Sequence, residues 1–274
     1  MCGVLGLNKS GYYYWASKKE SPRAIALKAH TEEIIAIYES SKKRYGSYKI
    51  QAKLGSQGIV TSRNRVARIM NKSGIKSIVN VKYKVRTTDS DHSNKISLNH
   101  LNRNFNPQSA SKVWVSDITY IHTEQGWLYL TTVIDLFDRK VIGWSLSDNM
   151  TTKDTIMKAW KMAVTNRQPL KGMIFHTDRG VQYTSKQFRE ILASYKVIQS
   201  MSRKGNCWDN AVAESFFKII KSEMIDHRYY YAHFQAKMDI VQFIEVWYNK
   251  QRIHASLGYL TPEEFGRNMN INAA

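Results

Sequence analysis

Apolar residues recur every three or four positions in the first third of the chain, and this spacing predicts a group of helices. Three signals mark the ends of these helices: Pro in the first turn, Ser or Thr at the N-cap, and Gly after the last turn. The helices are expected at Pro22 to about Glu39, at Ser47–Leu54, and from an N-cap at Thr61 or Ser62 to Ser73, before Gly74. Two short helices joined by a turn that contains Gly55 and Gly58 are typical of a helix-turn-helix. The alternative is an ordinary helical hairpin with a solvated basic face.

Beyond residue 112 the pattern changes to short runs of β-branched and aromatic residues that alternate with helical stretches. Strands are expected at Val113–Ile121, Trp127–Phe137, Val141–Leu146, Met173–His176 and Val197–Met201. Helices are expected at Asp154–Val164, Ser185–Tyr195 and Asp209–Met224. The first three strands most simply form an antiparallel meander. Three strands followed by helix, strand, helix, strand and helix is the element order of a ribonuclease-H-like α/β domain, although many α/β folds share parts of it.

A polar stretch, Thr87–Lys112, separates the two parts, and its composition and weak periodicity predict a linker. The expected organisation is a helical DNA-binding region over residues 1–86, a linker over 87–112, a core with a helical tail over 113–266, and a flexible tail over 267–274.

Composition excludes several classes of protein. The 274 residues (31.7 kDa) are 43% apolar and 23% charged, which excludes global disorder. No run approaches the roughly 18 to 20 apolar residues of a membrane span, and the N-terminus carries no secretory cleavage pattern. Cys2 and Cys207 are too few and too far apart for a disulfide framework or a thiolate metal site. We therefore expect a protein of the reducing cytoplasm.

Positive charge is concentrated in the first part of the chain. Lys and Arg number 41 against 22 Asp and Glu, a formal net charge of +19. Residues 1–110 hold 20 of the basic and 6 of the acidic side chains, and Lys42–Arg86 holds 13 Lys or Arg and no acid. This imbalance favours a polyanionic partner. Nucleic acid is favoured over a membrane, because no segment has the pattern of a membrane-surface helix.

The third predicted helix is the expected contact with DNA. Val66, Ile69 and Met70 form its apolar stripe. The basic side chains expected to bind base edges or phosphates are those of Arg63, Arg65, Arg68 and Lys72. The aromatic run from Tyr12 to Trp15 is able to stack on nucleotides, but packing against the helix opened by Pro22 is its favoured role.

Three carboxylates are the candidates for chemistry in the second part. An ionised carboxylate inside a buried strand needs a partner or a metal, and Asp117 lies in the middle of the run VWVSDITYI. Asp178 follows the end of a strand, where open α/β sheets place their ligand-binding groups. Glu214 lies on a helix, on the side opposite its apolar residues. Asp135 competes with Asp117, because it too lies in a hydrophobic strand-like run.

Divalent metal ions would explain a convergence of these acids. Carboxylates from two strands and a helix repel one another, and hard cations such as Mg²⁺ relieve that repulsion. Two such ions about 3.5–4 Å apart can activate an attacking oxygen and stabilise a leaving one in phosphoryl transfer. Lys218 and Lys221 share a helix face with Glu214 and are expected to hold the nucleic-acid backbone beside the metals. Taken singly, each acid also has a plainer role: Asp117 in capping or turning a strand, Asp178 in opening a turn, and Glu214 in an ion pair with Lys218.

The spacing and surroundings of the three acids resemble those of a known family. There are 60 residues between Asp117 and Asp178 and 35 between Asp178 and Glu214. The matching blocks are Trp114–Ile121 (WVSDITYI), His176–Tyr183 (HTDRGVQY), Ser200–Ala211 (SMSRKGNCWDNA) with Glu214–Phe216, Arg44–Gly46, and in the tail Tyr248, Asn249, Arg252, His254, Gly258, Tyr259 and Thr261–Glu263. Over nearly its whole length the chain resembles the second-frame protein (OrfB) of bacterial insertion sequences of the IS-three type, transposases related to retroviral integrases.

The resemblance implies a mixed five-stranded ribonuclease-H-like integrase core preceded by a small all-α, helix-turn-helix-like domain. It implies a DDE transposase that hydrolyses one strand at the element's end, after which the freed 3′-hydroxyl attacks a second phosphodiester directly. Asp117, Asp178 and Glu214 are then the catalytic residues and the ligands of Mg²⁺, with two ions expected and Mn²⁺ as a substitute. Lys218 and Lys221 fall where retroviral relatives have lysines that touch DNA.

The resemblance also implies partners and leaves other functions open. The partners are double-stranded DNA at element ends and target, an upstream-frame protein or its frameshift fusion, and further copies of the chain on DNA, with nucleoid association in a bacterial cytoplasm. Zinc is not expected, because the chain lacks the His/Cys module of retroviral integrases, and His176 and His254 are expected to be structural or to contact DNA. The alternatives are a DNA-binding regulator of transposition that does not cut, and a ribonuclease-H-type nuclease for RNA–DNA hybrids, which the basic N-terminal region disfavours.

Overall fold

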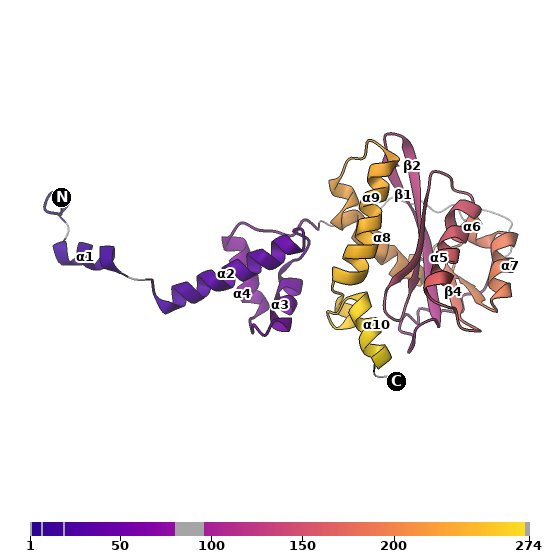
Figure 1. Ribbon diagram of the computed structural model, residues 1–274, viewed down its shortest axis with the longest axis horizontal. Helices are drawn as coiled ribbons and strands as arrows, with labels where there is room; N and C mark the ends of the chain where they lie inside the picture. The colour runs from indigo at the N-terminus through magenta and orange to yellow at the C-terminus, as the bar shows by residue number, and fades with distance from the viewer. Residues whose placement is uncertain (1, 7, 19, 80–95, 272–274) are drawn as a thin grey trace. The chain divides into compact units, whose positions relative to one another are not determined.

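The chain divides into two compact units, Met1–Ile78 and Val79–Ala274. The computed structural model describes residues 2–6, 8–18, 20–79 and 96–271 (Figure 1). Residues 87–95 of the expected linker lie outside the described residues. Each unit has buried apolar side chains of its own.

Three helices pack together in the first unit. They are α2 (Pro22–Ser40), α3 (Ser47–Ser56) and α4 (Arg63–Lys72). Their apolar stripes form a small core of buried side chains that includes Ile34, Ile37, Ile50, Leu54, Val66 and Ile69. Ser62 caps α4, because its Oγ accepts a hydrogen bond from Arg65 N at 3.2 Å. Gly74 follows with a φ of +66°, a conformation that favours glycine. The expected helices are thus confirmed.

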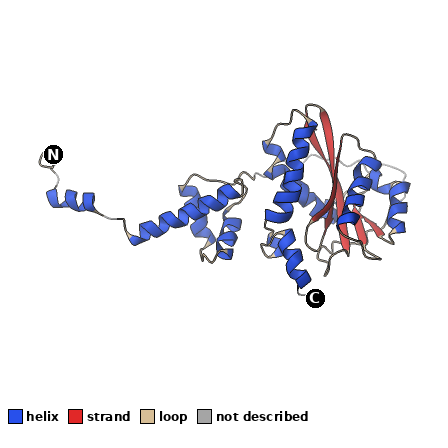
Figure 2. Cartoon of the chain, viewed as in Figure 1, coloured by secondary structure: helices blue, strands red, loops and turns tan. Residues whose placement is uncertain are grey.

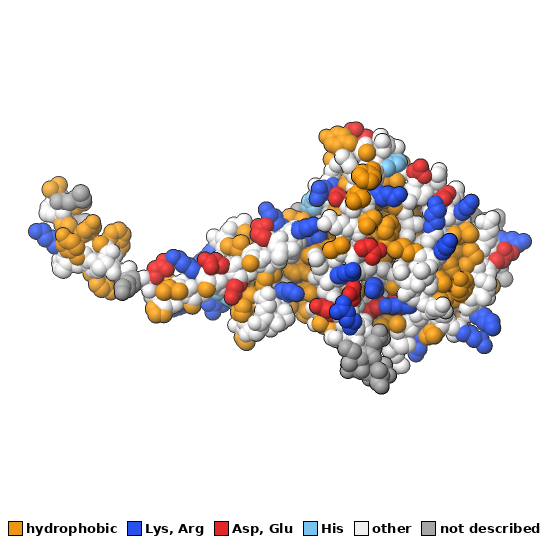
Figure 3. Space-filling view, in the orientation of Figure 1, with side chains coloured by type: hydrophobic (Ala, Val, Ile, Leu, Met, Phe, Trp, Pro, Cys, Tyr) orange, Lys and Arg blue, Asp and Glu red, His pale blue; other side chains and the backbone are white. Residues whose placement is uncertain are grey.

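A further helix, α1 (Lys9–Ser17), buries none of its residues. The aromatic side chains from Tyr12 to Trp15 are 43–72% exposed, and hydrophobic side chains cover much of the α1 surface in Figure 3. The expectation that this run packs against α2 is therefore wrong. Four consecutive aromatic residues spread around a helix instead of forming one stripe, so no single face gathers enough apolar area to dock.

A five-stranded mixed sheet forms the centre of the second unit (Figure 2). Its strands are β1 (Val113–Thr123), β2 (Gly126–Asp135), β3 (Val141–Ser147), β4 (Ile174–Thr177) and β5 (Ile198–Met201). The order across the sheet is β3-β2-β1-β4-β5. β1, β2 and β3 pair antiparallel, which confirms the expected meander, whereas β4 is parallel to β1 and β5 is parallel to β4. β1 is therefore the central strand.

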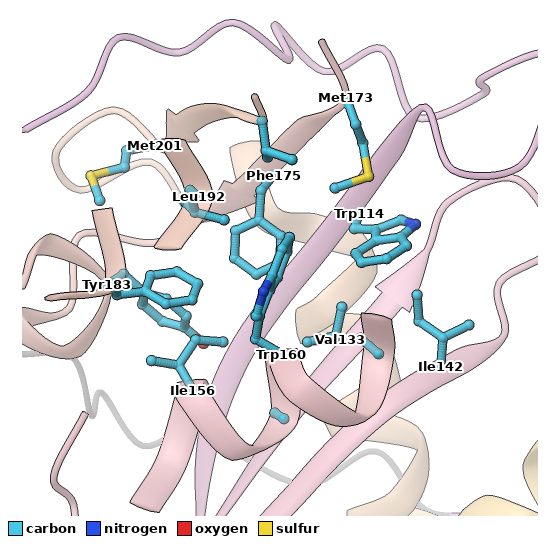
Figure 4. Close-up of a cluster of buried hydrophobic side chains, with 14 residues drawn as sticks. Trp114, Val133, Ile142, Ile156, Trp160, Met173, Phe175, Tyr183, Leu192 and Met201 are labelled. Carbon is cyan, nitrogen blue, oxygen red and sulfur yellow. The ribbon is translucent and has the colours of Figure 1, made fainter. Parts of the chain in front are cut away.

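Helices cover both faces of this sheet (Figure 1). One face carries the π-helical turn η1 (Lys153–Met157), α5 (Lys158–Asn166), α6 (Val181–Thr184) and α7 (Lys186–Ser194). Figure 4 shows the apolar cluster there, in which the Trp160 ring centre lies 5.2 Å from that of Phe175 and 5.6 Å from that of Trp114. The 3₁₀ turn η2 (Cys207–Asn210) leads into α8 (Ala211–Glu223) on the other face.

The chain continues through η3 (Ile225–His227), α9 (His233–Val241), η4 (Gln242–Gln251), η5 (Ala255–Leu257) and α10 (Pro262–Ile271). No described helix is both long and apolar enough to cross a membrane.

Two stretches that the sequence places outside the core are part of the second unit. Residues 96–112, expected in the linker, are held at β5, where Ser200 Oγ accepts hydrogen bonds from His100 N at 2.9 Å and Leu101 N at 3.1 Å. Leu101 is 2% exposed. Residues 267–271, expected in a flexible tail, continue α10. A buried leucine, backbone hydrogen bonds and polar side chains such as Asn99 and Arg103, both bonded to Asp209, anchor the first stretch, and such scattered contacts leave no periodic pattern.

Candidate active site

Asp117 lies in β1 and points to the face of the sheet that α8 covers. Successive side chains of a strand point to opposite faces. Its neighbours point to the α5 face, because Ser116 Oγ lies 2.9 Å from Tyr183 OH and Ile118 packs against the cluster of Figure 4. On the Asp117 side, Asn210 donates a hydrogen bond from Nδ2 to Ser116 O at 3.3 Å. The start of α8 is thus fastened beside Asp117.

Asp178 follows the last residue of β4, as the sequence predicts. β1 and β4 run parallel with Val115 opposite His176, so continuing this register by two residues brings Asp117 beside Asp178. Asp178 Oδ1 accepts a hydrogen bond from Gly180 N at 2.9 Å. A Cβ on residue 180 would lie only 3.1 Å from that oxygen, so the glycine lets the turn close on the carboxylate.

Glu214 lies in the first turn of α8 and is half-buried. The apolar side of the helix is buried as expected, with Ala213, Phe216, Phe217 and Ile220. Of the two lysines that follow Glu214 along its own side, Lys218 is exposed and Lys221 is half-buried. The first turn of a helix also favours a negative charge through the helix dipole.

The three acids share one electrostatic environment. Burial raises the pKa of Asp117 well above its usual value, and the neighbouring charge of Asp178 raises it further. The Ile118 N–H, 2.8 Å from Asp117 Oδ1, lowers this pKa, the charge of Glu214 raises it, and the charge of Lys221 lowers it. Since such effects fall off with distance, the acids in the turn after β4 and on α8 lie near enough to Asp117 to influence its charge.

These acids do not form a ready-made metal site. Across residues 2–6, 8–18, 20–79 and 96–271, no group of three His, Cys, Asp or Glu side chains is gathered closely enough to hold a metal ion. Neighbouring carboxylates repel one another, so a cation would have to draw them inward.

Asn210, which the reasoning from sequence did not single out, is bonded to Ser116 O beside Asp117 and precedes Glu214 by four residues. Its side chain is 3% exposed, and its buried Oδ1 has no hydrogen-bond donor in the described part of the chain. Buried acceptors normally have a donor, and a water bound to a metal would supply one. Carboxylate and carboxamide oxygens are ligands that Mg²⁺ prefers, so these residues fit that ion. The available signal was the position of Asn210 four residues before Glu214, one helical turn away.

Buried polar contacts hold the strand ends around the acids. His176 is fully buried, with its ring nitrogens 2.8 Å from Ser200 Oγ and 3.2 Å from Ser202 Oγ. Burial lowers the pKa of His176 to about 4, so the ring is neutral at pH 7. A side-chain hydrogen bond from Arg203 holds the pKa of the buried Asp209 below its usual range. Of the two roles expected for His176, structural or DNA-contacting, these buried contacts fit the structural one.

The tail residues form a second buried network at the end of α8. Glu223 accepts hydrogen bonds from Trp247 Nε1 at 2.9 Å and Arg252 Nε at 3.0 Å. His254 is 7% exposed, and its ring centre lies 4.9 Å from that of Tyr248. His254 therefore packs inside the tail.

The carboxylate of Asp135, the competing candidate, is already hydrogen-bonded to other groups. It is fully buried, and its carboxylate accepts hydrogen bonds from Arg167 Nη1 (2.7 Å), Ser111 N (2.8 Å), Trp114 Nε1 (3.0 Å) and Phe137 N (3.0 Å). A carboxylate that is paired with a guanidinium and bonded on both oxygens has little capacity left for a metal. This leaves Asp117 as the candidate in the first position.

The basic residues expected to bind DNA are exposed on the first unit. They are Arg63, Arg65, Arg68 and Lys72 of α4. Arg63 Nη1 donates a hydrogen bond to Tyr48 OH at 2.6 Å, and its guanidinium carbon lies 4.7 Å from the centre of the Tyr48 ring. This contact orients one of the four cations, and all four are open to a polyanion.

Comparison with known families covers both units. Residues 107–207 and 195–262 match two models described as integrase core domains, and residues 26–83 match a model described as an HTH-like domain. Similar solved structures include the HTLV-2 integrase catalytic core domain in complex with magnesium (18% identity, TM-score 0.43, 58% of this chain and 98% of that chain). Another is the catalytic core domain of BIV integrase (14% identity, TM-score 0.43, 60% and 98%).

Curated relatives match the chain from end to end. It is 35% identical over 274 residues to the insertion element IS600 uncharacterized 31 kDa protein of Shigella sonnei, with 100% of both chains covered. It is 35% identical over 248 residues to the transposase for insertion sequence element IS904 of Lactococcus lactis (90% of this chain, 97% of the relative). It is also 35% identical over 274 residues to the transposase InsF for insertion sequence IS3A of Escherichia coli (99% and 94%). With its integrase core and HTH-like domain, the chain belongs to the IS3 family of insertion-sequence transposases.

Proposed function

We propose that this transposase cuts DNA at the ends of its element and joins the freed end to a target. Asp117, Asp178 and Glu214 hold two Mg²⁺ ions, for which Mn²⁺ can substitute. The observation that supports this proposal is that the charges of Asp178, in the turn after β4, and Glu214, in the first turn of α8, both act on the buried Asp117 of β1. When bound, the ions supply an activated attacking oxygen and a stabilised leaving oxygen.

The protein's own contribution is rigid placement. Asp117 is fixed on the central strand, and Asp178 is fixed by its hydrogen bond to Gly180 N. Glu214 sits on a helix whose start is tied to β1 through Asn210. The exposed Lys218 and the half-buried Lys221 continue along the same helix side and bind backbone phosphates.

The proposed reaction has two phosphoryl transfers. In the first, water attacks a phosphodiester at the element's end, the bond from phosphorus to the 3′ oxygen breaks, and a 3′-hydroxyl is left. In the second, that hydroxyl attacks a target phosphodiester, whose own bond to the 3′ oxygen breaks. Positioning and charge stabilisation suffice for such transfers, so no covalent protein intermediate is needed.

In this proposal the first unit holds double-stranded DNA through the cations of α4. Each phosphate neutralised by a cation releases counterions, so the affinity should fall steeply with salt. The double variant Arg65→Ala/Arg68→Ala should bind more weakly and flatten the slope of log affinity against log salt by about 2. Fluorescence anisotropy with a labelled end-containing duplex measures both. An unchanged slope would remove these residues from the interface.

The cleavage test uses DNA that contains the element's end, incubated with Mg²⁺. The variants Asp117→Asn, Asp178→Asn and Glu214→Gln should each abolish strand cleavage and leave DNA binding near normal. Asp148→Asn is the matched control, because Asp148 is an exposed acid in the loop after β3. A variant that still cuts at the wild-type rate would remove that residue from the metal site.

The same assay separates the alternative functions. It is run with and without the upstream-frame protein, because that partner is proposed to help recognise the end. Normal binding without cleavage under both conditions supports a regulator that does not cut. Faster cleavage of an RNA–DNA hybrid than of duplex DNA supports a ribonuclease-H-type nuclease.

A further inference from the structure

Trp208 is a large aromatic side chain left exposed beside the proposed site. It lies in η2, in the segment that leads to Glu214, and is 68% exposed. By contrast, Trp114 and Trp160 in the core of the same unit are 0% and 3% exposed. Exposure alone carries no function, since single exposed apolar side chains are common. The setting of Trp208 is what distinguishes it.

The two residues after Trp208 are buried polar anchors. Asp209 is fully buried and accepts hydrogen bonds from Arg203 Nε and Nη2, each at 2.8 Å. Asn210, 3% exposed, donates a hydrogen bond to Ser116 O. Because both anchors are held, the backbone that carries Trp208 is held as well. The indole is therefore presented to solvent from a fixed position.

The surroundings of Trp208 favour a nucleic acid. Asn210 ties this segment to Ser116, the residue before Asp117, and its buried Oδ1 lacks a donor in the described part of the chain. Arg203, whose guanidinium is paired with Asp209, and the exposed Lys204 precede Trp208 in the same segment, and Lys204 adds positive charge there. Cations attract the phosphate backbone, and an indole face stacks on any base. An exposed cation and a fixed aromatic face thus lie along one segment next to the acids.

We propose that Trp208 stacks on the base of a nucleotide next to the phosphate that the three acids act on, once that base has left the duplex. This inference rests on the proposed function. A paired base inside a duplex is already stacked on both sides, so it offers no face to the indole. A base at a DNA end can unpair, and stacking on a protein ring compensates part of the lost pairing. Trp208 thereby holds the end open and keeps the phosphate at the carboxylates.

Stacking can be measured without cleavage. The Asp117→Asn protein, which does not cut in our proposal, is mixed with a duplex that carries 2-aminopurine in a two-nucleotide unpaired end. Stacking on the indole should quench the fluorescence several-fold. Adding Trp208→Ala to this protein should abolish the quenching, and adding Trp208→Phe should keep part of it. Equal quenching with and without Trp208 would overturn the proposal even if the protein never cuts DNA.

Cleavage then tests the consequence for the reaction. On a fully paired end, Trp208→Ala should cut about 10-fold more slowly, and Trp208→Phe should stay within about 3-fold of the wild type. Trp127→Ala is the matched control, because Trp127 is 52% exposed but lies at the turn end of the β1–β2 hairpin. Mismatching the terminal pairs should restore part of the rate of Trp208→Ala, since unpairing no longer has to be driven.

The last experiment uses a DNA substrate with an abasic site at the position of the base proposed to stack on Trp208. It should make the wild type and Trp208→Ala cut at the same rate, because neither protein then has a base to stack on and neither has a pair to open at that position. A wild type that stays faster than Trp208→Ala at the abasic site, or a wild-type rate for Trp208→Ala on the paired end, would overturn the proposal. Thermal unfolding of each variant is compared with the wild type, and little change is expected because Trp208 is exposed.

Discussion

Two aspartates on neighbouring strands show opposite ways of keeping a carboxylate inside a sheet. Asp135 ends β2 and Asp117 lies in β1, and burial raises the pKa of both. For Asp135 the next largest effect is the cation of Arg167, which lowers the pKa. For Asp117 the next largest effect is the anion of Asp178, which raises it. The chain supplies a counterion to one acid and further acids to the other.

This is the difference expected between a structural acid and a functional one. A buried carboxylate with its own guanidinium is complete, and breaking the pair destabilises the fold. A buried carboxylate among other carboxylates is unfavourable for folding unless a cation arrives from outside, and such perturbed groups are concentrated at functional sites. Asp135 should therefore matter for stability and Asp117 for activity.

The variant Asp117→Asn should separate these two properties most strongly. Its cleavage rate should fall at least about 1000-fold, because the metal loses a ligand. Its free energy of unfolding should stay the same or rise, because the amide removes repulsion with Asp178 and Glu214. Single-turnover cleavage and urea unfolding of the same preparation measure the two effects. A clear loss of stability would place Asp117 in the same class as Asp135.

The variant Arg167→Met should have the opposite profile, because it leaves the buried Asp135 and Asp138 without their shared cation. The free energy of unfolding should fall by about 3–5 kcal/mol at pH 7. Without Arg167 the pKa of Asp135, already raised by burial, rises further. The folded variant then retains a proton that the unfolded chain releases, so its stability falls as pH rises from about 4 through the folded pKa.

The loss in Arg167→Met should therefore be smaller at pH 5 than at pH 7, in urea unfolding at each pH. Lys161→Met is the matched control, since Lys161 is an exposed cation on α5. An equal loss at both pH values would mean that the pair with Asp135 is not the source of the effect.

Local patterns in the sequence predict much of the second unit but do not separate these two acids, and only the resemblance to a known family favoured Asp117. Strands and helices leave local periodic patterns, and the positions of Asp117, Asp178 and Glu214 relative to them follow from those patterns. Asp135 lies in the same kind of apolar run as Asp117. What distinguishes it is a hydrogen bond to Arg167, which is 32 residues away along the chain. Such a contact depends on how α5 packs on the sheet, and no local pattern encodes it.

The reason why the sequence did not single out Asn210 is the same. Asn210 belongs to a motif visible in the sequence, but its Oδ1 is buried, with no donor among the described residues, because α8 is docked on β1. For the aromatic run of α1 the error is the opposite one. Its apolar composition predicted burial, but its side chains do not form the single apolar stripe that burial requires. Periodicity predicts elements well, whereas partners across elements require the packed fold.

Mg²⁺ should stabilise the protein only while the acids around Asp117 are complete. At ten times its Kd, an ion that binds the folded state alone adds about 1.4 kcal/mol, roughly a 3 °C rise in Tm for a unit of this size. Asp178→Asn should lose this rise in Tm. Asp148→Asn should keep it, because Asp148 is an exposed acid in the loop after β3. Thermal unfolding at constant ionic strength measures the shift. A full shift in Asp178→Asn would place the ion elsewhere.

The smallest expected effect tests whether Lys221 is a counterion of Asp117, as Arg167 is of Asp135. Lys221 lowers the pKa of Asp117, but less than any other group acting on it, and burial lowers its own pKa. Lys221→Met should therefore change the free energy of unfolding by less than about 0.5 kcal/mol and weaken DNA binding about threefold through a lost phosphate contact. Urea unfolding and anisotropy measure these effects, with the exposed Lys218→Met as the matched variant. A loss of about 2 kcal/mol or more in Lys221→Met alone would make Lys221 an internal counterion. Asp117 would then be a completed ion pair, and the case for an external cation at this acid would fail.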